Sequence, residues 1–311
     1  HCNATFTEEN PYIKRYCHFP DRLYLESIKE TFCLQSFSSI AKRFGVSVTS
    51  IIRWFDKLNF PHPKLPECIA IDEFRGNAGG EKFQCNIADP VKHQVIDILP
   101  SRNTENLCKH FLEYPYKERA AVKKIVMDLS TLFRSVAKTM FPEAKIVADK
   151  FHVIRVVINS LENVRKRIQK EFHATKRKWF KRSRYLLLKP GYKLTDEDKI
   201  ELARMLNSSY DLEKAYVLKE RFYEVFRKQT RTEAKKELGK WLLLAADLSL
   251  PEFRHCITTF SNWKTEIANI IGERVSNGFI EGSNNKIKVL KRISYGVQNF
   301  DRFRNRILYL Q

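Results

Sequence analysis

The sequence predicts an α/β fold in which a mixed sheet is interrupted by a long all-helical insertion and preceded by a small helical domain. Three observations support this prediction. The hydrophobic period changes from helical to strand-like near residue 68. Strand-like and helical segments then alternate as far as residue 150, and from 151 to 263 the pattern is helical throughout. A chain of 311 residues with 43% hydrophobic side chains is long enough to bury such cores.

The small helical domain is expected at residues 20–60, and it contains a helix-turn-helix pattern. Ile40 belongs to one apolar face, and Ile51 returns to the same core. Gly45 permits the tight turn between two helices, and Ser47 can cap the second. An ordinary three-helix packing unit has the same pattern, and both interpretations stay open. On the first interpretation, the second helix offers polar side chains to a DNA major groove, namely Thr49, Ser50 and Arg53.

Strands are expected after a proline-rich linker. Pro61, Pro63 and Pro66 disfavour helix and end the helical domain. Short connections predict an antiparallel meander of three strands, at 68–74, 83–88 and 94–99. Helices and strands then alternate, with helices at 103–113, 131–140 and from about 151, and strands at 123–127 and 144–148. This order is that of the ribonuclease H-like fold, a mixed sheet flanked by helices, whose first part would span residues 67–158.

A basic helical insertion is expected at residues 159–268, before the core resumes at 269–311. Between Phe151 and Pro190 there are twelve Lys or Arg residues and two acidic ones, interleaved with the aromatic side chains Trp179, Phe180 and Tyr185. This mixture favours a platform for the phosphate backbone of DNA, and a solvated charged face is the alternative. The candidate DNA-binding side chains are Arg165, Lys166, Arg177, Lys178, Lys181, Arg182 and Arg184.

Composition narrows the class of partner. The net charge of +20 favours a polyanion such as DNA or RNA, and a generally basic protein is the alternative. No apolar stretch approaches the roughly 20 residues that cross a bilayer, so no membrane partner is expected. Seven cysteines, an odd number with no two-residue spacing, fit a reducing cytoplasm. The chain begins with His1-Cys2 rather than Met, which predicts that an N-terminal piece precedes it.

Four acidic residues, Asp72, Asp128, Asp149 and Glu281, lie where a metal-dependent nuclease core would need them. Asp72 lies within the first predicted strand and Asp128 ends the fourth, and these strands are neighbours in a ribonuclease H-like sheet. Glu281 would join them from a helix packed across the same sheet end. Two divalent ions roughly 4 Å apart can hold the attacking and leaving oxygens of a phosphodiester between such carboxylates. A simpler role for Glu281 is a favourable interaction with the dipole of its helix.

Further polar residues accompany these carboxylates. Asn284 or Asn285 follows Glu281 by one helical turn and Lys288 by two, a polar stripe suited to metal and phosphate. Asp149 and His152 lie at a strand-to-helix junction. Asp149 is expected to cap the new helix, and a supporting active-site role for the pair is the alternative.

The ordered motifs resemble those of the DDE transposases of the ISL-three insertion-sequence family. The resemblance covers nearly the whole chain and rests on residues 70–74, 127–128, 148–152, 278–288 and 295–308. It implies that Asp72, Asp128 and Glu281 form the catalytic, metal-binding triad, with two Mg²⁺ or Mn²⁺ ions. Metal-bound water would cut the element's end, and the freed 3′ hydroxyl would attack target DNA.

The resemblance also implies a setting. The partner would be double-stranded DNA, both the terminal inverted repeats and the target, bound by a homodimer near the bacterial nucleoid in the cytoplasm. An upstream zinc ribbon is implied as well, of which residues 1–19 would be a remnant that keeps only Cys2. Zinc is therefore expected only in the missing N-terminal segment. Two alternatives stay open: a ribonuclease H-like nuclease or resolvase without strand transfer, and a non-catalytic DNA-binding regulator derived from a transposase.

Overall fold

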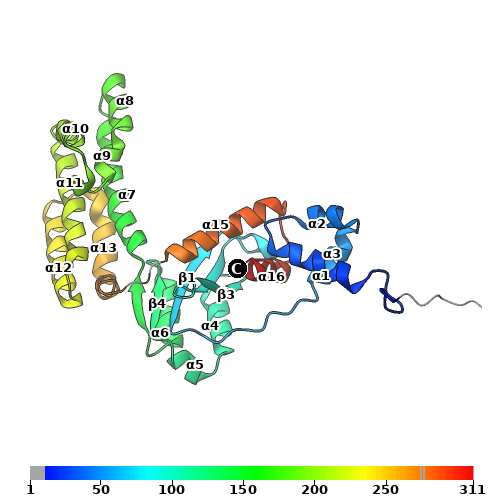
Figure 1. Ribbon diagram of the computed structural model, residues 1–311. Coiled ribbons are helices and arrows are strands. Elements are labelled where there is room, and N and C mark those ends of the chain that lie inside the picture. Colours follow the sequence, from blue (N-terminus) through cyan, green and yellow to red (C-terminus); the bar gives the residue numbers. More distant parts are fainter. Residues whose placement is uncertain (1–10, 274, 276, 311) are drawn as a thin grey trace, which may run out of the picture. The chain divides into compact units, whose positions relative to one another are not determined.

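The chain is an α/β protein built around a five-stranded mixed sheet (Figure 1). The computed structural model describes residues 11–273, 275 and 277–310. The strand order is β3-β2-β1-β4-β5, with antiparallel pairing among β1, β2 and β3 and parallel pairing between β4 and β5. The strands are β1 (Cys68–Phe74), β2 (Gln84–Asp89), β3 (Gln94–Leu99), β4 (Lys124–Met127) and β5 (Lys145–Ala148). The predicted α/β class, with its meander, is confirmed.

The chain divides into two compact units. The first comprises His1–Arg119 and Gly278–Gln311, and the second comprises Ala120–Asn277. The first unit holds β1 to β3 and the helices α1 (Asp21–Lys29), α2 (Phe37–Phe44), α3 (Val48–Phe55), α4 (Thr104–Leu112), α15 (Gly278–Ile293) and α16 (Phe300–Tyr309). A short helix that the sequence pattern did not predict, α5 (Tyr116–Ala120), lies at the boundary.

Local signals set the bounds of α2 and α3. Gly45 ends α2 in the left-handed region with φ of 64°, which costs glycine little and other residues more. Ser47 then caps α3, its hydroxyl accepting from the backbone N–H of Ser50 at 3.0 Å. Ile40 and Ile51 are buried together between the two helices. The turn and the cap predicted for this segment are thus confirmed.

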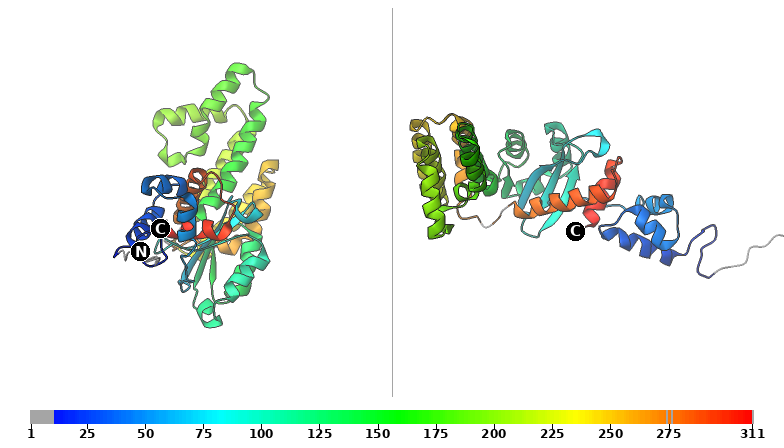
Figure 2. Two further views of the ribbon diagram at one scale, coloured as in Figure 1. Left: turned by 90° about the vertical axis from the view of Figure 1, so that its right-hand side faces the viewer. Right: turned by 90° about the horizontal axis from the view of Figure 1, so that it is seen from above.

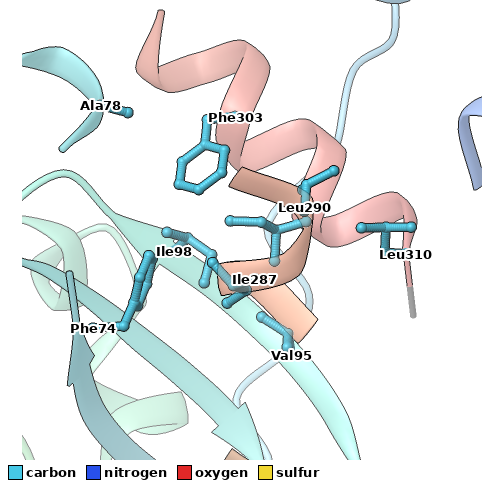
Figure 3. Close-up of a cluster of buried hydrophobic side chains, with 9 residues drawn as sticks. Phe74, Ala78, Val95, Ile98, Ile287, Leu290, Phe303 and Leu310 are labelled. Carbon is cyan, nitrogen blue, oxygen red and sulfur yellow. The ribbon is translucent and has the colours of Figure 1, made fainter. Parts of the chain in front are cut away.

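The core of the first unit lies between the meander and the two C-terminal helices. α15 packs on β1 and β2, and α16 packs on β3 (Figures 1 and 2). In Figure 3, Ile287 and Leu290 of α15 and Phe303 of α16 converge on Phe74 and Ile98 of the strands. Burying such side chains stabilises a fold by about 1.5–3 kcal/mol each. This apolar contact holds α15, which carries Glu281, against the strand that carries Asp72.

The second unit combines β4 and β5 with a helical bundle. The neighbours α7 and α11, α11 and α12, and α12 and α13 pack in pairs (Figure 1), and Phe222, Trp241 and Phe260 lie in the bundle core. Short 3₁₀ turns follow Pro190 and begin at Pro251, so the helical region is interrupted at these prolines. The helices are α6 (Thr131–Met140), α7 (Lys150–Gln169), α8 (Ala174–Arg182), α9 (Arg184–Leu188), α10 (Asp196–Leu206), α11 (Tyr210–Tyr223), α12 (Arg231–Asp247), α13 (Arg254–Asn262) and α14 (Lys264–Ala268).

The helices of the described part of the chain are too short or too polar to cross a membrane. Cys2 of the expected zinc-ribbon remnant lies outside the residues that the structure describes.

Candidate active site

In the first unit, an amide network joins Asp72 of β1 to α15. The Asn284 side-chain N–H donates to Oδ2 of Asp72 at 2.9 Å. The Oδ1 atom of Asn284 accepts from Nδ2 of Asn86 at 2.9 Å, and Asn86 is the cross-strand partner of Asp72 in β2. Asn284 is 4% exposed, so its polar groups depend on these partners rather than on water. The strand register therefore fixes where α15 meets the carboxylate of Asp72.

Glu281 lies one turn before Asn284 in the first turn of α15, and it is exposed. Residues three apart share a helix face, so Glu281 lies on the side of α15 that bears the contact with Asp72. Asp72 is half-buried, and its Oδ1 accepts from the backbone N–H of Glu73 at 2.8 Å. Glu73 itself forms an ion pair with Arg102. The carboxylate of Glu73 is thus engaged by Arg102, unlike that of its neighbour Asp72, which contacts α15.

The two asparagines after Glu281 differ in environment. Asn284 is buried against Asp72, whereas Asn285 is exposed and accepts from Nζ of Lys288 at 3.3 Å. The first therefore orients a carboxylate, and the second belongs to the solvent-facing stripe with Lys288. The sequence offered either asparagine, and only packing separates them.

In the second unit, two aspartates follow adjacent parallel strands. Met127 of β4 pairs with Ala148 of β5, and Asp128 and Asp149 come directly after them. The backbone N–H of Asp149 donates to the carbonyl of Met127 at 2.7 Å. Because both strands end here, the two aspartates lie at the same sheet edge. The carboxylate of Asp128 also accepts from the backbone N–H of Ser130 at 3.1 Å.

Asp149 makes both contacts that the sequence suggested as alternatives. Its carboxylate caps α7 by accepting from the backbone N–H groups of Phe151 and His152, at 3.4 and 3.3 Å. Its Oδ2 also lies 2.6 Å from Nδ1 of His152. Asp149 is buried and His152 is half-buried. The capping prediction is confirmed, and the carboxylate also sets the orientation of the imidazole.

Most of the basic side chains expected to bind DNA are exposed, and three of them gather beside α8. Arg177, Lys178 and Lys181 line a hollow of about 470 Å³ with Phe172 and Gln169. The remaining exposed candidates are Lys166, Arg182 and Arg184.

Arg165 requires a correction. It is 4% exposed, and its guanidinium donates to both carboxylate oxygens of Glu162, at 2.8 and 2.7 Å. A buried, bidentate pair of this kind faces the protein interior, so Arg165 is not a DNA contact. The aromatic platform is also revised, because Phe180 is fully buried and Trp179 packs on it and donates to Glu201. Tyr185 alone of the three is largely exposed.

On α3, Thr49 and Arg53 are exposed and Ser50 is half-buried. The Ser50 hydroxyl lies 2.9 Å from that of Ser47, so it takes part in the helix cap. Thr49 and Arg53 are therefore the freer of the three side chains for an external contact.

A second constellation in the first unit was not singled out from the sequence. His62, Asp97 and His110 each bring one potential ligand atom within 4.8 Å of the others. They come from a linker, a strand and a helix, so no local spacing pattern signals them. They are separate from the carboxylates described above.

Comparison with known proteins gives a consistent result. A family model described as transposase matches residues 69–307, a span that includes Asp72, Asp128 and Glu281. The chain is 24% identical over 312 residues to the transposase for insertion sequence element IS1001 of Bordetella parapertussis, covering 97% of this chain and 76% of that protein. It is 27% identical over 236 residues to the transposase for insertion sequence element IS1557 of Mycobacterium tuberculosis, covering 68% of this chain and 53% of that protein. A shorter likeness, 32% identity over 116 residues, to a Lactococcus lactis protein named ATP-dependent protease covers 37% of this chain.

Proposed function

Because the chain belongs to the ISL-three family of DDE transposases, we propose that it cuts the ends of an insertion sequence and joins them to target DNA. Family membership implies an enzyme that cleaves nucleic acid, a DNA partner and a need for divalent metal. Asp72, Asp128 and Glu281 are the carboxylates proposed to hold two Mg²⁺ or Mn²⁺ ions. Such ions supply an activated water and stabilise the oxygen that leaves the phosphodiester.

The observation that carries the proposal is the hydrogen bond from Asn284 to Asp72. It connects the strand bearing one proposed ligand to the helix bearing another, Glu281, through the side-chain amide of a buried residue. A carboxylate held in this way keeps its orientation before metal arrives, which lowers the cost of assembling a site. Asn284 is thus proposed as a positioning residue for Asp72.

Asp149 and His152 are proposed to support the reaction in the second unit. With a proton on Nδ1, the His152 ring donates to Asp149. Its Nε2 can then accept a proton or, when the ring is charged, face a phosphate oxygen. The orientation of His152 therefore depends on Asp149, in the way that carboxylates orient histidines in other sites.

DNA binding is proposed at two surfaces. Thr49 and Arg53 of α3 suit contacts in a major groove, and the basic hollow beside α8 suits the phosphate backbone. Because two element ends must be handled together, we propose a homodimer on DNA. The bacterial cytoplasm, close to the nucleoid, is the proposed location.

The test is cleavage of a labelled duplex that carries the cognate element end, with Mg²⁺, with Mn²⁺ and with chelator. Glu281→Gln, Asp72→Asn and Asp128→Asn should each abolish nicking while DNA binding is retained. Glu105→Gln is the matched control, because Glu105 is an exposed glutamate in the first turn of another helix of the same unit. Nicking that survives in a variant removes that residue from the triad.

Two further outcomes separate the alternatives. A pre-cut end that is not joined to target DNA, despite metal-dependent nicking, would indicate a nuclease or resolvase. Binding without nicking under every metal condition would indicate a DNA-binding regulator. Both outcomes overturn the proposed strand transfer.

A further inference from the structure

The group formed by His62, Asp97 and His110 in the first unit has the composition of a metal site. Oδ2 of Asp97 lies 3.3 Å from Nδ1 of His62 and 3.7 Å from Nδ1 of His110. The two imidazole rings stand 5.5 Å apart between centroids. Nitrogen ligands bind zinc at about 2.0–2.1 Å, so tetrahedral ligands lie about 3.3 Å apart. The two separations from Asp97 are close to that value, and all three ligand atoms lie within 4.8 Å of one another.

The carboxylate of Asp97 is prepared for such a role. Its side chain is 1% exposed. Oδ1 accepts from the backbone N–H of Ile98 at 2.7 Å and from the guanidinium of Arg304. These two donors fix the carboxylate and leave Oδ2 directed toward the histidines. The positive charge of Arg304 disfavours the binding of a cation nearby. The negative charges of the Asp97 and Glu113 carboxylates offset that repulsion.

The polar groups beside Asp97 are incompletely paired by protein atoms. His110 is 6% exposed, and its Nε2 is buried with no hydrogen-bond partner in the described structure. The hydroxyl of Tyr114, whose ring packs on that of His110, is also buried with no hydrogen-bond partner in the described structure. The unpaired Nε2 lies across the imidazole ring from the Nδ1 atom that faces Asp97, so no protein hydrogen bond at Nε2 fixes the tautomer of His110.

An ion has a path to the group, and a second carboxylate supports it. His62 and Glu113 line an open hollow of about 440 Å³ together with Asp97 and His110. Nε2 of His62 lies 3.3 Å from Oε2 of Glu113. A histidine that binds metal through one nitrogen commonly donates from the other to a carboxylate. Glu113 is placed to do this for His62.

We propose that His62, Asp97 and His110 bind a single transition-metal ion of the zinc class, oriented by Glu113 and Arg304. Two imidazoles and one carboxylate suit Zn²⁺, Co²⁺ or Ni²⁺, whereas Mg²⁺ prefers oxygen ligands only. The ion ties the linker before β1 to β3 and α4. This site is independent of the proposed two-ion catalytic site, because it shares no residue with Asp72, Asp128 or Glu281.

The test is Zn²⁺ binding to the full chain, measured by titration against a chromophoric chelator in excess Mg²⁺, which occupies the carboxylate site. His62→Gln and His110→Gln should each bind one Zn²⁺ ion per chain fewer than wild type. Glu113→Gln should weaken the affinity for that Zn²⁺ ion about 10- to 100-fold. His255→Gln is the control, because His255 is an exposed histidine of the second unit.

A folding control accompanies the titration. His62 has a side chain that is 45% exposed, so His62→Gln should melt at the wild-type temperature without metal. Added Zn²⁺ should raise the melting temperature of wild type and leave that of His62→Gln unchanged. Equal Zn²⁺ stoichiometry in wild type and His62→Gln would overturn the proposal.

Discussion

Replacing Asn284 by Asp tests the network that orients Asp72. The substitution keeps the shape of the side chain but places a second carboxylate oxygen where an N–H now lies 2.9 Å from Oδ2 of Asp72. The hydrogen bond from Asn86 can persist, because Oδ1 remains an acceptor. The substitution therefore exchanges the attractive contact with Asp72 for a repulsive one, and it also removes the longer contact, 3.5 Å, from the same amide nitrogen to the carbonyl oxygen of Glu73.

The magnitude follows from two limits. Two unit charges at 2.9 Å repel by about 6 kcal/mol at an effective dielectric constant of about 20. One carboxylate can instead take up a proton, which costs about 4 kcal/mol at pH 7 from an ordinary pKa of about 3.9. Protonation of one carboxylate costs less than the repulsion, so it determines the loss of stability. We expect the free energy of unfolding of Asn284→Asp to be lower than that of wild type by about 3–4 kcal/mol at pH 7.

The stability of Asn284→Asp should fall as pH rises. In the variant the folded pair has a raised pKa, so the folded state binds a proton that the unfolded state releases. The stability of the variant is then fully present below the unfolded pKa and is lost as pH rises through the folded pKa. The deficit relative to wild type should shrink by about 1.4 kcal/mol for each pH unit below 7, down to about pH 4.

Urea unfolding of wild type and variant between pH 4 and pH 8 measures this deficit. Asn285→Asp is the matched control, because Asn285 is the exposed neighbour that pairs with Lys288, and it should change stability by less than about 0.5 kcal/mol. Mg²⁺ should restore part of the loss if the paired carboxylates bind it. A deficit below about 1 kcal/mol at pH 7, or one that does not fall with pH, would refute the reasoning.

Two other predictions concern the helices proposed to bind DNA. Gly45→Ala should lower the stability of the first unit by about 1 kcal/mol in thermal unfolding, because φ is 64° and nothing lies within 4 Å of the added Cβ to change the outcome; an unchanged melting temperature would contradict it. Lys178→Glu and Lys181→Glu should weaken binding to any duplex sequence and lower the slope of log affinity against log salt by about 1 each, measured by fluorescence anisotropy. Unchanged slopes would show that Lys178 and Lys181 of α8 do not contact the DNA backbone.

Short-range signals determined much of the fold. The change of hydrophobic period gave β1 and β3 their observed bounds, and the bounds of α6 likewise agree with the helical pattern. Ser47 and Asp149 were recognised as caps because a cap depends only on the next two or three residues. The same holds for Gly45, whose turn lies between two adjacent helices. The family, too, follows from ordered motifs in the sequence.

Tertiary structure decided which side chains face inward and which distant ones meet. Arg165 and Lys166 are adjacent in one basic run, but Glu162 and the bundle core bury the first and leave the second exposed. Asn284 and Asn285 are the same residue type at adjacent positions. Only the packing of α15 on β1 brings Asn284, and not Asn285, into contact with Asp72. The group of His62, Asp97 and His110 lies beyond local pattern altogether. Its members meet only because a linker, a strand and a helix fold together, and no spacing along the chain encodes that encounter.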